Sequence, residues 1–140
     1  YGPYDPSGKY RNVIPNFIKS ALSGKNLIIT GTGNETRDFT YVDDVVDGII
    51  LAGTKPKGKN QIFNLGTGKE TKISFIAQEI IKQTKSKSKI SFKPRRSFDH
   101  ITRRKMDISN AKKLLGYNPK VKIGDGLIKT CEWAQLGGLN

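Results

Sequence analysis

The sequence predicts a mixed α/β fold, built from amphipathic helices and short strands without a complete doubly wound parallel sheet. Apolar residues recur at helical spacing in several segments that glycine or proline separates. The apolar runs between these segments are short, which is typical of small strands. Hydrophobic residues make up 35% and charged residues 26% of the 140 residues, which is the composition of a globular chain with a modest core.

Five segments have the spacing of amphipathic helices. The first carries Pro15 in its first turn and ends at Gly24. The second spans residues 44–52, where we expect Asp43 or Asp44 to be the cap. Ser74, Ser109 and Asp125 are the expected caps of the other three. The apolar stripes are Ile14, Phe17, Ile18, Ala21 and Leu22; Val45, Val46, Ile49 and Ile50; Phe75, Ile76 and Ile80; Ala111, Leu114 and Leu115; and Leu127, Ile128, Cys131 and Ala134.

Short strands are predicted between these helices, at residues 26–30, 38–42, 61–65 and 90–93. The strand at 61–65 is apolar enough to be buried, and Pro94 stops the last one. The chain shows no internal repeat and no internal boundary. We therefore predict a single domain over residues 1–140.

The glycine turn that follows the first strand organises the candidate site. Gly31 and Gly33 permit a tight turn, and Arg37 follows it shortly before the second helix. A cation presented next to a rigid element suits the binding of an anion such as a phosphate.

Five motifs in order give the chain a family resemblance. The string R-D-F-x-Y-V-x-D at residues 37–44 follows the G-x-G turn, and Y-G-P, N-V-I-P and N-L-G-T-G stand at residues 1–3, 12–15 and 64–68. R-K-M-D-I-S-N-A-K at 104–112 runs into L-L-G-Y at 114–117. In these motifs the chain resembles the extended short-chain dehydrogenase/reductase family, specifically its NAD-dependent nucleotide-sugar epimerases and dehydratases.

The resemblance implies both an architecture and a set of site residues. The chain would be the C-terminal substrate-binding lobe of an extended Rossmann-type epimerase, with the N-terminal NAD-binding Rossmann domain missing. The segment 61–65 would be an element that normally joins the Rossmann sheet. Arg37 would meet the diphosphate, with Arg96 as the second arginine, or Arg95 in its place, and Asp99 would accept hydrogen bonds from the ribose. The remaining implied substrate-binding residues are Asn12, Val13, Ile28, Thr30 and Ile73.

The resemblance also implies an activity. The full enzyme would be of the UDP-glucose 4-epimerase type, oxidising the sugar at C4 with NAD and returning the hydride to the other face. A UDP-glucuronate decarboxylase and a dTDP-glucose 4,6-dehydratase are the alternatives within the family. The expected partner is a nucleotide-diphosphate sugar, a UDP-sugar first. Full-length relatives form homodimers, whereas this portion alone is expected to be a monomer that neither binds NAD nor turns over substrate.

The chain carries no catalytic constellation of its own. Neither glycine turn has the third glycine of a dinucleotide fingerprint, and none of the five tyrosines has a lysine four residues later. His100 is the only histidine, which excludes a two-histidine metal site. The lone Cys131 lies in an apolar stripe and is expected in the core. We therefore predict a binding surface, with no catalytic, cofactor-binding or metal-binding residues.

The net charge of +13 makes a basic nucleic-acid-binding module the hypothesis of another class. Ten lysines and arginines lie between Lys82 and Lys105 against one acidic residue, Asp99. Aromatic residues are not interleaved with them as a single-strand binding face requires, so nucleic acid is not the expected partner. The sequence contains no apolar run of about 18 residues, so a membrane span is not expected. With one cysteine no internal disulfide can form, and we expect a cytoplasmic protein.

Overall fold

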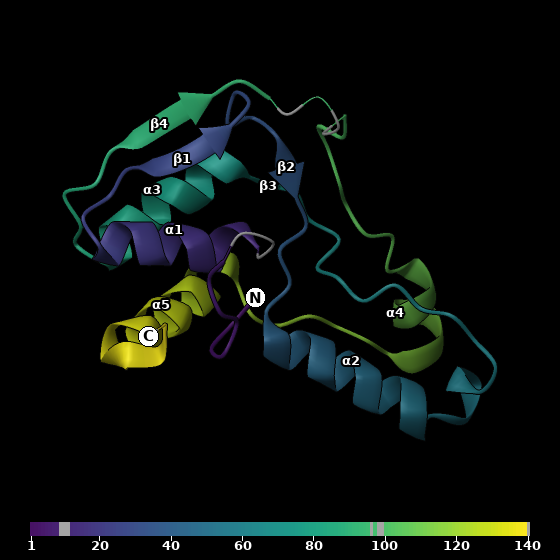
Figure 1. Cartoon of the computed structure of the whole chain (residues 1–140). Helices are drawn as coiled ribbons and strands as arrows, with labels where there is room; N and C mark the ends of the chain where they lie inside the picture. The colour runs from purple at the N-terminus through teal and green to yellow at the C-terminus, as the bar shows by residue number, and fades with distance from the viewer. Residues whose placement is uncertain (9–11, 96, 98–99, 140) are drawn as a thin grey trace.

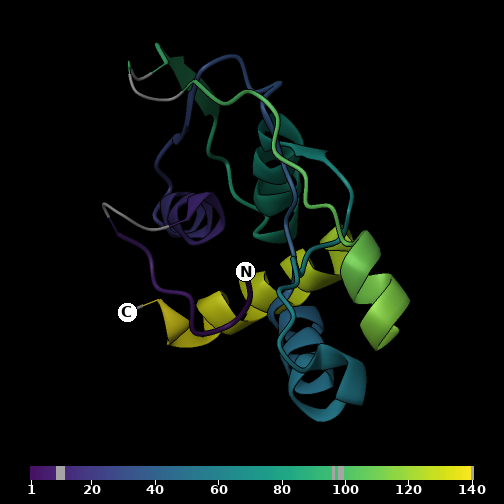
Figure 2. The same cartoon turned by 90° about the vertical axis from the view of Figure 1, so that its right-hand side faces the viewer.

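The computed structural model describes residues 1–8, 12–95, 97 and 100–139. In the larger part of the fold, a pair of strands lies over a layer of helices (Figure 1). Strands β1 (Leu27–Thr30) and β4 (Ile90–Lys93) pair in parallel, with Leu27 opposite Ile90. Helices α1 (Val13–Leu22) and α3 (Ile73–Gln83) pack together beneath this pair. Helix α5 (Ile123–Trp133) crosses below them and continues into a wider turn, Ala134–Gly138 (Figure 2).

The main hydrophobic core lies between these layers because each element turns an apolar stripe inward. Ile14 and Ile18 of α1, Ile76 and Ile80 of α3 and Leu127 of α5 are all at most 1% exposed. The core also contains Phe17, Ala21, Leu27, Ile29, Ala77, Cys131 and Ala134. Burial of Cys131 raises the pKa of its thiol to about 12, so the predicted core role of this cysteine is confirmed.

A second, smaller core lies to one side (Figure 1). Helix α4 (Ser109–Leu115) packs there against the end of α2 (Val42–Thr54) and the one-turn helix Pro56–Gly58. Buried Tyr117 donates its hydroxyl to the Gly66 carbonyl at 3.1 Å, and burial raises the pKa of this phenol to about 12. The α/β class predicted from the sequence is confirmed. The fold contains two hydrophobic cores.

A narrow ribbon connects the two cores. Strand β2 (Thr36–Arg37) pairs antiparallel with β3 (Thr71–Lys72). On its other edge, residues 102–104 run parallel to β2: the Thr36 N–H donates to the Thr102 carbonyl at 2.9 Å, and the Arg104 N–H donates to the Thr36 carbonyl at 3.2 Å. The ribbon therefore has a third strand, residues 102–104, which comes from a distant part of the sequence.

Two predicted strands are wrong in this structure. Residues 38–42 leave the ribbon after Arg37 because the Asp38 carboxylate binds a different segment, and Val42 already starts α2. Residues 61–65 join neither of the two described sheets. The segment is not buried either, because the side chain of Ile62 is 92% exposed. An apolar segment of this kind pairs as a strand only where a neighbouring strand is present, and none of the described strands lies beside it.

The helices lie where periodicity predicts them, but the predicted caps are wrong. Helices α2, α3, α4 and α5 follow Tyr41, Lys72, Ile108 and Lys122 at the N-cap positions. Asp43, Ser74, Ser109 and Asp125 lie inside the first turns instead. Just before α4, the Asp107 carboxylate accepts the Ser109 N–H at 2.9 Å. Hydrogen bonds from the Ser109 side chain and then from its N–H lower the pKa of Asp107.

Helix α2 buries the opposite face from the one that its apolar residues suggest. Val46, Ile49 and Ile50 are 45%, 59% and 55% exposed, while Asp44 is 2% exposed. A methyl group on the buried Gly48 would collide with Leu65, because this glycine packs directly against the second core. The apolar stripe of α2 is thus an outward surface in this chain.

The buried carboxylate of Asp44 joins α2 to the loop before α5. Its two oxygens accept the Lys120 N–H at 2.8 Å and the Val121 N–H at 3.1 Å. We expect Asp44→Ala to lower the free energy of unfolding by about 2–4 kcal/mol, because two partly buried N–H groups lose their acceptor. Urea unfolding measures this loss. The neighbouring Asp43→Ala, at an exposed position, should cost less than about 1 kcal/mol, and equal costs would contradict the assigned role of Asp44.

Within the described ranges, no helix is long and apolar enough to cross a bilayer. The same residues contain no group of three or more histidine, cysteine or acidic side chains able to hold a metal ion.

Candidate functional site

A cavity of about 750 Å³ opens where the two cores meet. Its walls come from the start of α1, from β1, from the ribbon and the chain after it, and from residues 104–106. It combines apolar side chains with amide, hydroxyl, carboxylate and guanidinium groups. Its lining residues include Val13, Ile28, Ile73, Asp38, Arg37 and Arg104.

Six of the eight predicted site residues line this one cavity. Asn12 and Val13 come from the start of α1, Ile28 and Thr30 from β1, Arg37 from β2 and Ile73 from the first turn of α3. Arg96 and Asp99 lie outside the described residues, so their roles stay predictions. The structure thus brings together side chains from segments far apart in sequence, and their binding role also stays a prediction.

Arg95, the predicted substitute for Arg96, is described and does not line the cavity. Its Nη2 atom is buried and has no hydrogen-bond partner among the described residues. The charge of Arg95 is close enough to Glu35 to help lower the pKa of that carboxyl.

The start of α1 forms one wall of the cavity. Asn12 occupies the N-cap position, but its side chain makes no hydrogen bond to the helix; its amide instead donates to Asp5 at 3.4 Å. The first N–H groups of a helix and its dipole favour negative charge at this end. An anion in the cavity would meet this end of α1.

Two arginines line the cavity from adjacent strands of the ribbon. Arg37 donates from Nη1 to the Thr36 carbonyl at 2.7 Å and to the Thr102 carbonyl at 3.4 Å, and from Nη2 to the Ile101 carbonyl at 3.1 Å. These carbonyls hold the guanidinium plane in place. Arg104 lines the cavity from the neighbouring strand, which supplies the Thr102 carbonyl. Two guanidinium groups at one cavity offer paired donors to a multiply charged anion.

Asp38 holds three segments of the site together. Its carboxylate accepts the Gly68 N–H at 2.9 Å, the Thr67 N–H at 2.9 Å and, at a very short distance, the Thr67 hydroxyl. It also accepts the Met106 N–H at 3.2 Å. Asp38 therefore fixes the turn at 66–68 and the strand end near Arg104 relative to Arg37.

Both glycine turns are occupied by carboxylates of this chain. Glu35 accepts the Thr32 N–H at 3.2 Å and the Gly33 N–H at 2.8 Å, just as Asp38 accepts the donors of the second turn. Burial acts to raise the pKa of Glu35, but these backbone donors outweigh it and the pKa is lowered. At Gly31, where φ is 105°, an added Cβ would collide with this carboxylate.

Sequence reasoning missed Arg104, Glu35 and Asp38 as parts of the site. Arg104 appeared only as the first residue of a family motif, within the basic run R-R-K at 103–105. A period of two identifies alternate residues of a strand as one face, but no local signal shows that 102–104 pairs with β2. Contacts between such distant segments cannot be inferred from spacing along the chain.

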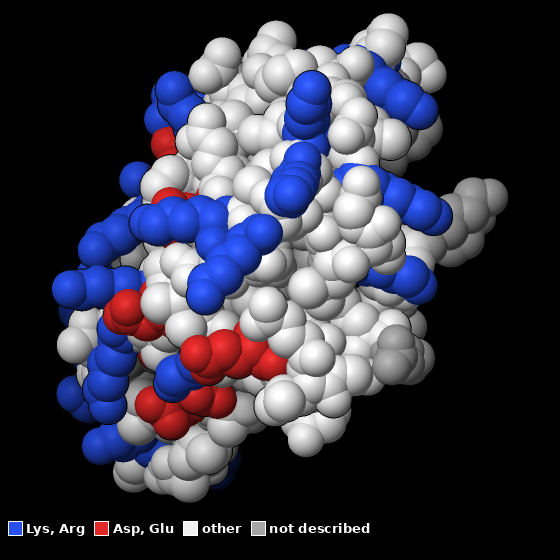
Figure 3. All heavy atoms as spheres, turned by 90° about the vertical axis from the view of Figure 1, so that its left-hand side faces the viewer, with Lys and Arg blue, Asp and Glu red and all other residues white. Residues whose placement is uncertain are grey.

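The basic surface does not form one continuous face on the side shown in Figure 3. Lysine and arginine side chains stand there in several groups, with acidic and uncharged atoms between them. Lys82 pairs with Glu79 at 3.7 Å, whereas Lys85, Lys87 and Lys89 are exposed on the following loop. An extended nucleic-acid surface would need a continuous basic face, which this side of the molecule does not present.

Known proteins resemble this chain in sequence and in fold. Residues 1–66 match the model of the NAD dependent epimerase/dehydratase family. A UDP-N-acetyl-alpha-D-glucosaminuronate decarboxylase of Bacillus cytotoxicus is 38% identical over 138 residues, which is 95% of this chain and 43% of that protein. An epimerase from Methanothermobacter thermautotrophicus superposes with a TM-score of 0.95 at 39% identity, over 98% of this chain and 41% of that one.

A third similar protein was solved with a nucleotide sugar. The UDP-glucose 4-epimerase of Thermotoga maritima, crystallised with UDP-glucose, gives a TM-score of 0.91 at 34% identity, over 98% of this chain and 43% of that chain. The chain spans about two fifths of the length of the relatives that it matches.

Proposed function

This chain belongs to the NAD-dependent epimerase/dehydratase family, and on that premise we propose that it forms the nucleotide-sugar-binding lobe of such an enzyme. The enzyme is of the UDP-glucose 4-epimerase type, and this lobe holds the nucleotide diphosphate of its substrate. The observation that carries the proposal is the shared cavity: Arg37 and Arg104 line it together with the start of α1. Two cations and a helix N-terminus suit two adjacent phosphate groups.

The rest of the cavity suits a nucleoside. Ile28, Val13 and Ile73 give apolar surface for a flat base, and Asn12, Asn16 and Thr30 add amide and hydroxyl groups that can orient it. The site has no aromatic ring at position 30 to stack on the base. Asp99 remains our proposed partner of the ribose hydroxyls, and Arg96 the proposed further cation at the diphosphate.

The glycine turns of this chain do not fit NAD. A dinucleotide site needs free backbone N–H groups at a strand-to-helix turn, to receive the pyrophosphate. Here Glu35 and Asp38 already accept the N–H groups of the two glycine turns. The proposed enzyme therefore takes its NAD site and its acid–base residues from a Rossmann part outside these 140 residues.

The outward stripe of α2 is the proposed contact with that Rossmann part. Val46, Ile49 and Ile50 expose a row of apolar surface at helical spacing, and the neighbouring segment 61–65 exposes Ile62. The matched relatives have more than half of their length beyond the region that this chain covers. A sheet edge in that remainder would give 61–65 the strand partner that the described chain does not supply.

We expect the triple substitution Val46→Ser, Ile49→Ser, Ile50→Ser to change the free energy of unfolding of this chain by less than about 1 kcal/mol, because exposed side chains lose little packing. The buried Ile76→Ser is the control and should cost more than about 3 kcal/mol. Sedimentation velocity should show the native chain as a monomer at low concentration, with self-association at high concentration that the triple variant abolishes. A large stability cost of the triple variant would contradict an outward stripe.

A decarboxylase acting on a UDP-hexuronate is the second candidate, because the similar Bacillus cytotoxicus protein is a decarboxylase. Both reactions share the diphosphate-binding lobe. UDP affinity therefore tests the lobe, whereas turnover of UDP-glucose or UDP-glucuronate by the complete protein separates the two activities.

Calorimetric titration of this chain with UDP, uridine and NAD tests the proposed function. UDP should bind at least about tenfold more tightly than uridine, since charge-assisted contacts to the diphosphate contribute more than 1.4 kcal/mol. A single-stranded oligonucleotide is the control for general basic attraction, and its affinity should fall more steeply with salt than that of UDP. Equal affinity for UDP and uridine would refute the diphosphate site.

A further inference from the structure

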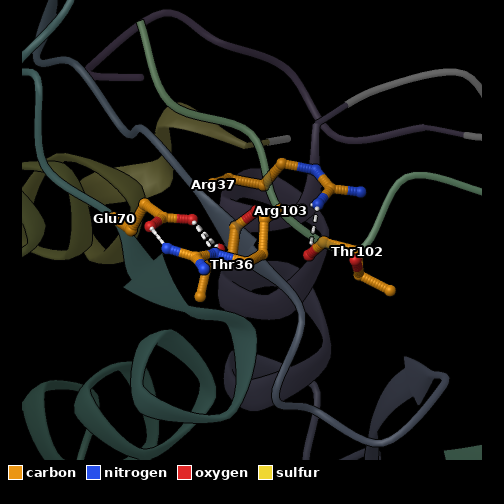
Figure 4. Close-up of polar contacts among 5 residues, drawn as sticks. All are labelled: Thr36, Arg37, Glu70, Thr102 and Arg103. Atoms are coloured by element: carbon orange, nitrogen blue, oxygen red, sulfur yellow. Dashed lines mark hydrogen bonds and ion pairs between the residues drawn. The ribbon is translucent and has the colours of Figure 1, made fainter.

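A carboxylate outside the cavity connects the three strands of the ribbon, which are β2, β3 and residues 102–104. Glu70, directly before β3, receives the Arg103 Nε at 3.0 Å and the Arg103 Nη2 at 2.5 Å. The same carboxylate accepts the Thr36 hydroxyl at 2.5 Å. Figure 4 shows Glu70 reaching Arg103 across Thr36, whereas Arg37 extends away from it toward Thr102.

The ribbon therefore has two faces, of which one binds Glu70 and the other lines the cavity. Thr36 and Arg103, which lie opposite each other, bind Glu70 and do not line the cavity. Their successors, Arg37 and Arg104, both line the cavity. Successive side chains of a strand point to opposite faces, so fixing Thr36 and Arg103 on one face turns the next two residues to the other.

Register matters here because the strand carries three cations in succession. A shift of residues 102–104 by one position would turn Arg104 away and present Arg103 or Lys105 to the cavity. Three sets of side-chain contacts oppose the shift: the fork of Arg103 on Glu70, the Met106 N–H on Asp38, and the Arg37 guanidinium on the carbonyls of residues 101 and 102. Among the described residues, the backbone hydrogen bonds between this strand and β2 all involve Thr36.

We propose that Glu70 is a positioning residue, which holds Arg103 on the outer face of the ribbon so that Arg104 stays at the diphosphate end of the cavity. The inference rests on the proposed function and deepens it. The ion pair of Glu70 and Arg103, outside the cavity, determines that Arg104 is the cation of this strand that faces the cavity. Arginine suits position 103, since a guanidinium meets a carboxylate through two parallel bonds and a lysine cannot.

The ionisation of Glu70 agrees with this role. The hydrogen bonds from Arg103 and then from Thr36 lower the pKa of its carboxyl to about 2. Because the folded-state pKa is depressed below 4.5, the stabilisation by this pair is present above about pH 4.5 and is lost as the pH falls toward 2. The ion pair is therefore intact throughout the neutral range.

Calorimetric UDP titration of four forms of the chain tests the proposal: native, Glu70→Ala, Arg104→Ala and the double variant. Glu70→Ala should weaken UDP binding about three- to tenfold, although Glu70 does not line the cavity. In that background Arg104→Ala should cost less than about threefold, against about tenfold in the native chain, because Arg104 is no longer held in place. Glu79→Ala, which removes a surface carboxylate paired with Lys82, is the matched control and should leave UDP affinity unchanged.

Two further measurements separate positioning from a general loss of structure. Exchanging the charges, as Glu70→Arg with Arg103→Glu, should recover part of the lost affinity. In the absence of ligand, hydrogen exchange at the Thr36 and Arg104 amides should accelerate in Glu70→Ala, while amides of α1 and α3 keep their protection. Equal costs of Arg104→Ala in both backgrounds, or unchanged exchange at both amides, would overturn the positioning role. Native protein that binds no UDP would instead refute the proposed function, and the exchange measurement would still decide the role of Glu70.

Discussion

Arg37→Ala is expected to weaken UDP binding roughly ten- to a hundredfold, because a charge-assisted contact to phosphate is worth about 1.5–3 kcal/mol. The three carbonyls of Thr36, Ile101 and Thr102 hold the guanidinium at the cavity, so its positive charge is fixed in place before any ligand arrives. Isothermal titration calorimetry with UDP measures the change. Arg37→Lys should recover only part of the affinity, since an ammonium group lacks the planar fork.

The partner arginines provide the matched comparison for Arg37. If Arg37 and Arg104 meet the same diphosphate, the double alanine variant should lose less affinity than the two single losses added together. The same cycle with Arg96→Ala tests the arginine that the family resemblance indicates. Thermal unfolding of each variant must accompany the titrations, because Arg37 also binds backbone carbonyls. Native affinity in Arg37→Ala would mean that the glycine turn and Arg37 serve the fold alone.

Asp38→Ala should have the largest effect on the site as a whole. Four donors, on Thr67, Gly68 and Met106, lose one acceptor together, so we expect the free energy of unfolding to fall by about 2–4 kcal/mol. UDP affinity should fall as well, by more than about tenfold, since the strand end near Arg104 is released from Arg37. Urea unfolding and UDP titration measure the two effects.

Two substitutions control for this interpretation. Asp38→Asn keeps one side-chain oxygen as an acceptor and should give intermediate losses of stability and of affinity. Asp47→Ala removes an exposed carboxylate from α2 and should change the free energy of unfolding by less than about 0.5 kcal/mol. An Asp38→Ala protein as stable as Asp47→Ala would show that the four hydrogen bonds contribute nothing.

The predictions that succeeded rest on local periodicity. The stripe of Ile14, Phe17 and Ile18 identified α1, and short apolar runs identified β1 and β4, since repeats of 3.6 and 2 residues are local properties. The strand predicted at 38–42 failed because Asp38 binds residues that lie about thirty positions away. The stripe of α2 also misled, because periodicity reveals that a helix has an apolar face and not which partner covers it.

The candidate site shows the same division. Family motifs located Asn12, Val13, Ile28, Thr30, Arg37 and Ile73, which the structure gathers around one cavity. Arg104 and Glu70 escaped because their roles depend on the parallel pairing of residues 102–104 with β2. A run of three adjacent cations gives no local hint of which one faces inward.

The most direct test of the proposed site is to map UDP onto the protein by nuclear magnetic resonance. With backbone amides and arginine Nε groups labelled, added UDP should shift the signals of Arg37, Arg104, Val13 and Ile73 together, with one shared affinity. The amides of Lys85, Lys87 and Lys89, which lie on the exposed basic loop, should stay unperturbed. Shifts spread over those lysines with none at Arg37 and Arg104 would show that UDP binds a basic surface and would contradict the site described here.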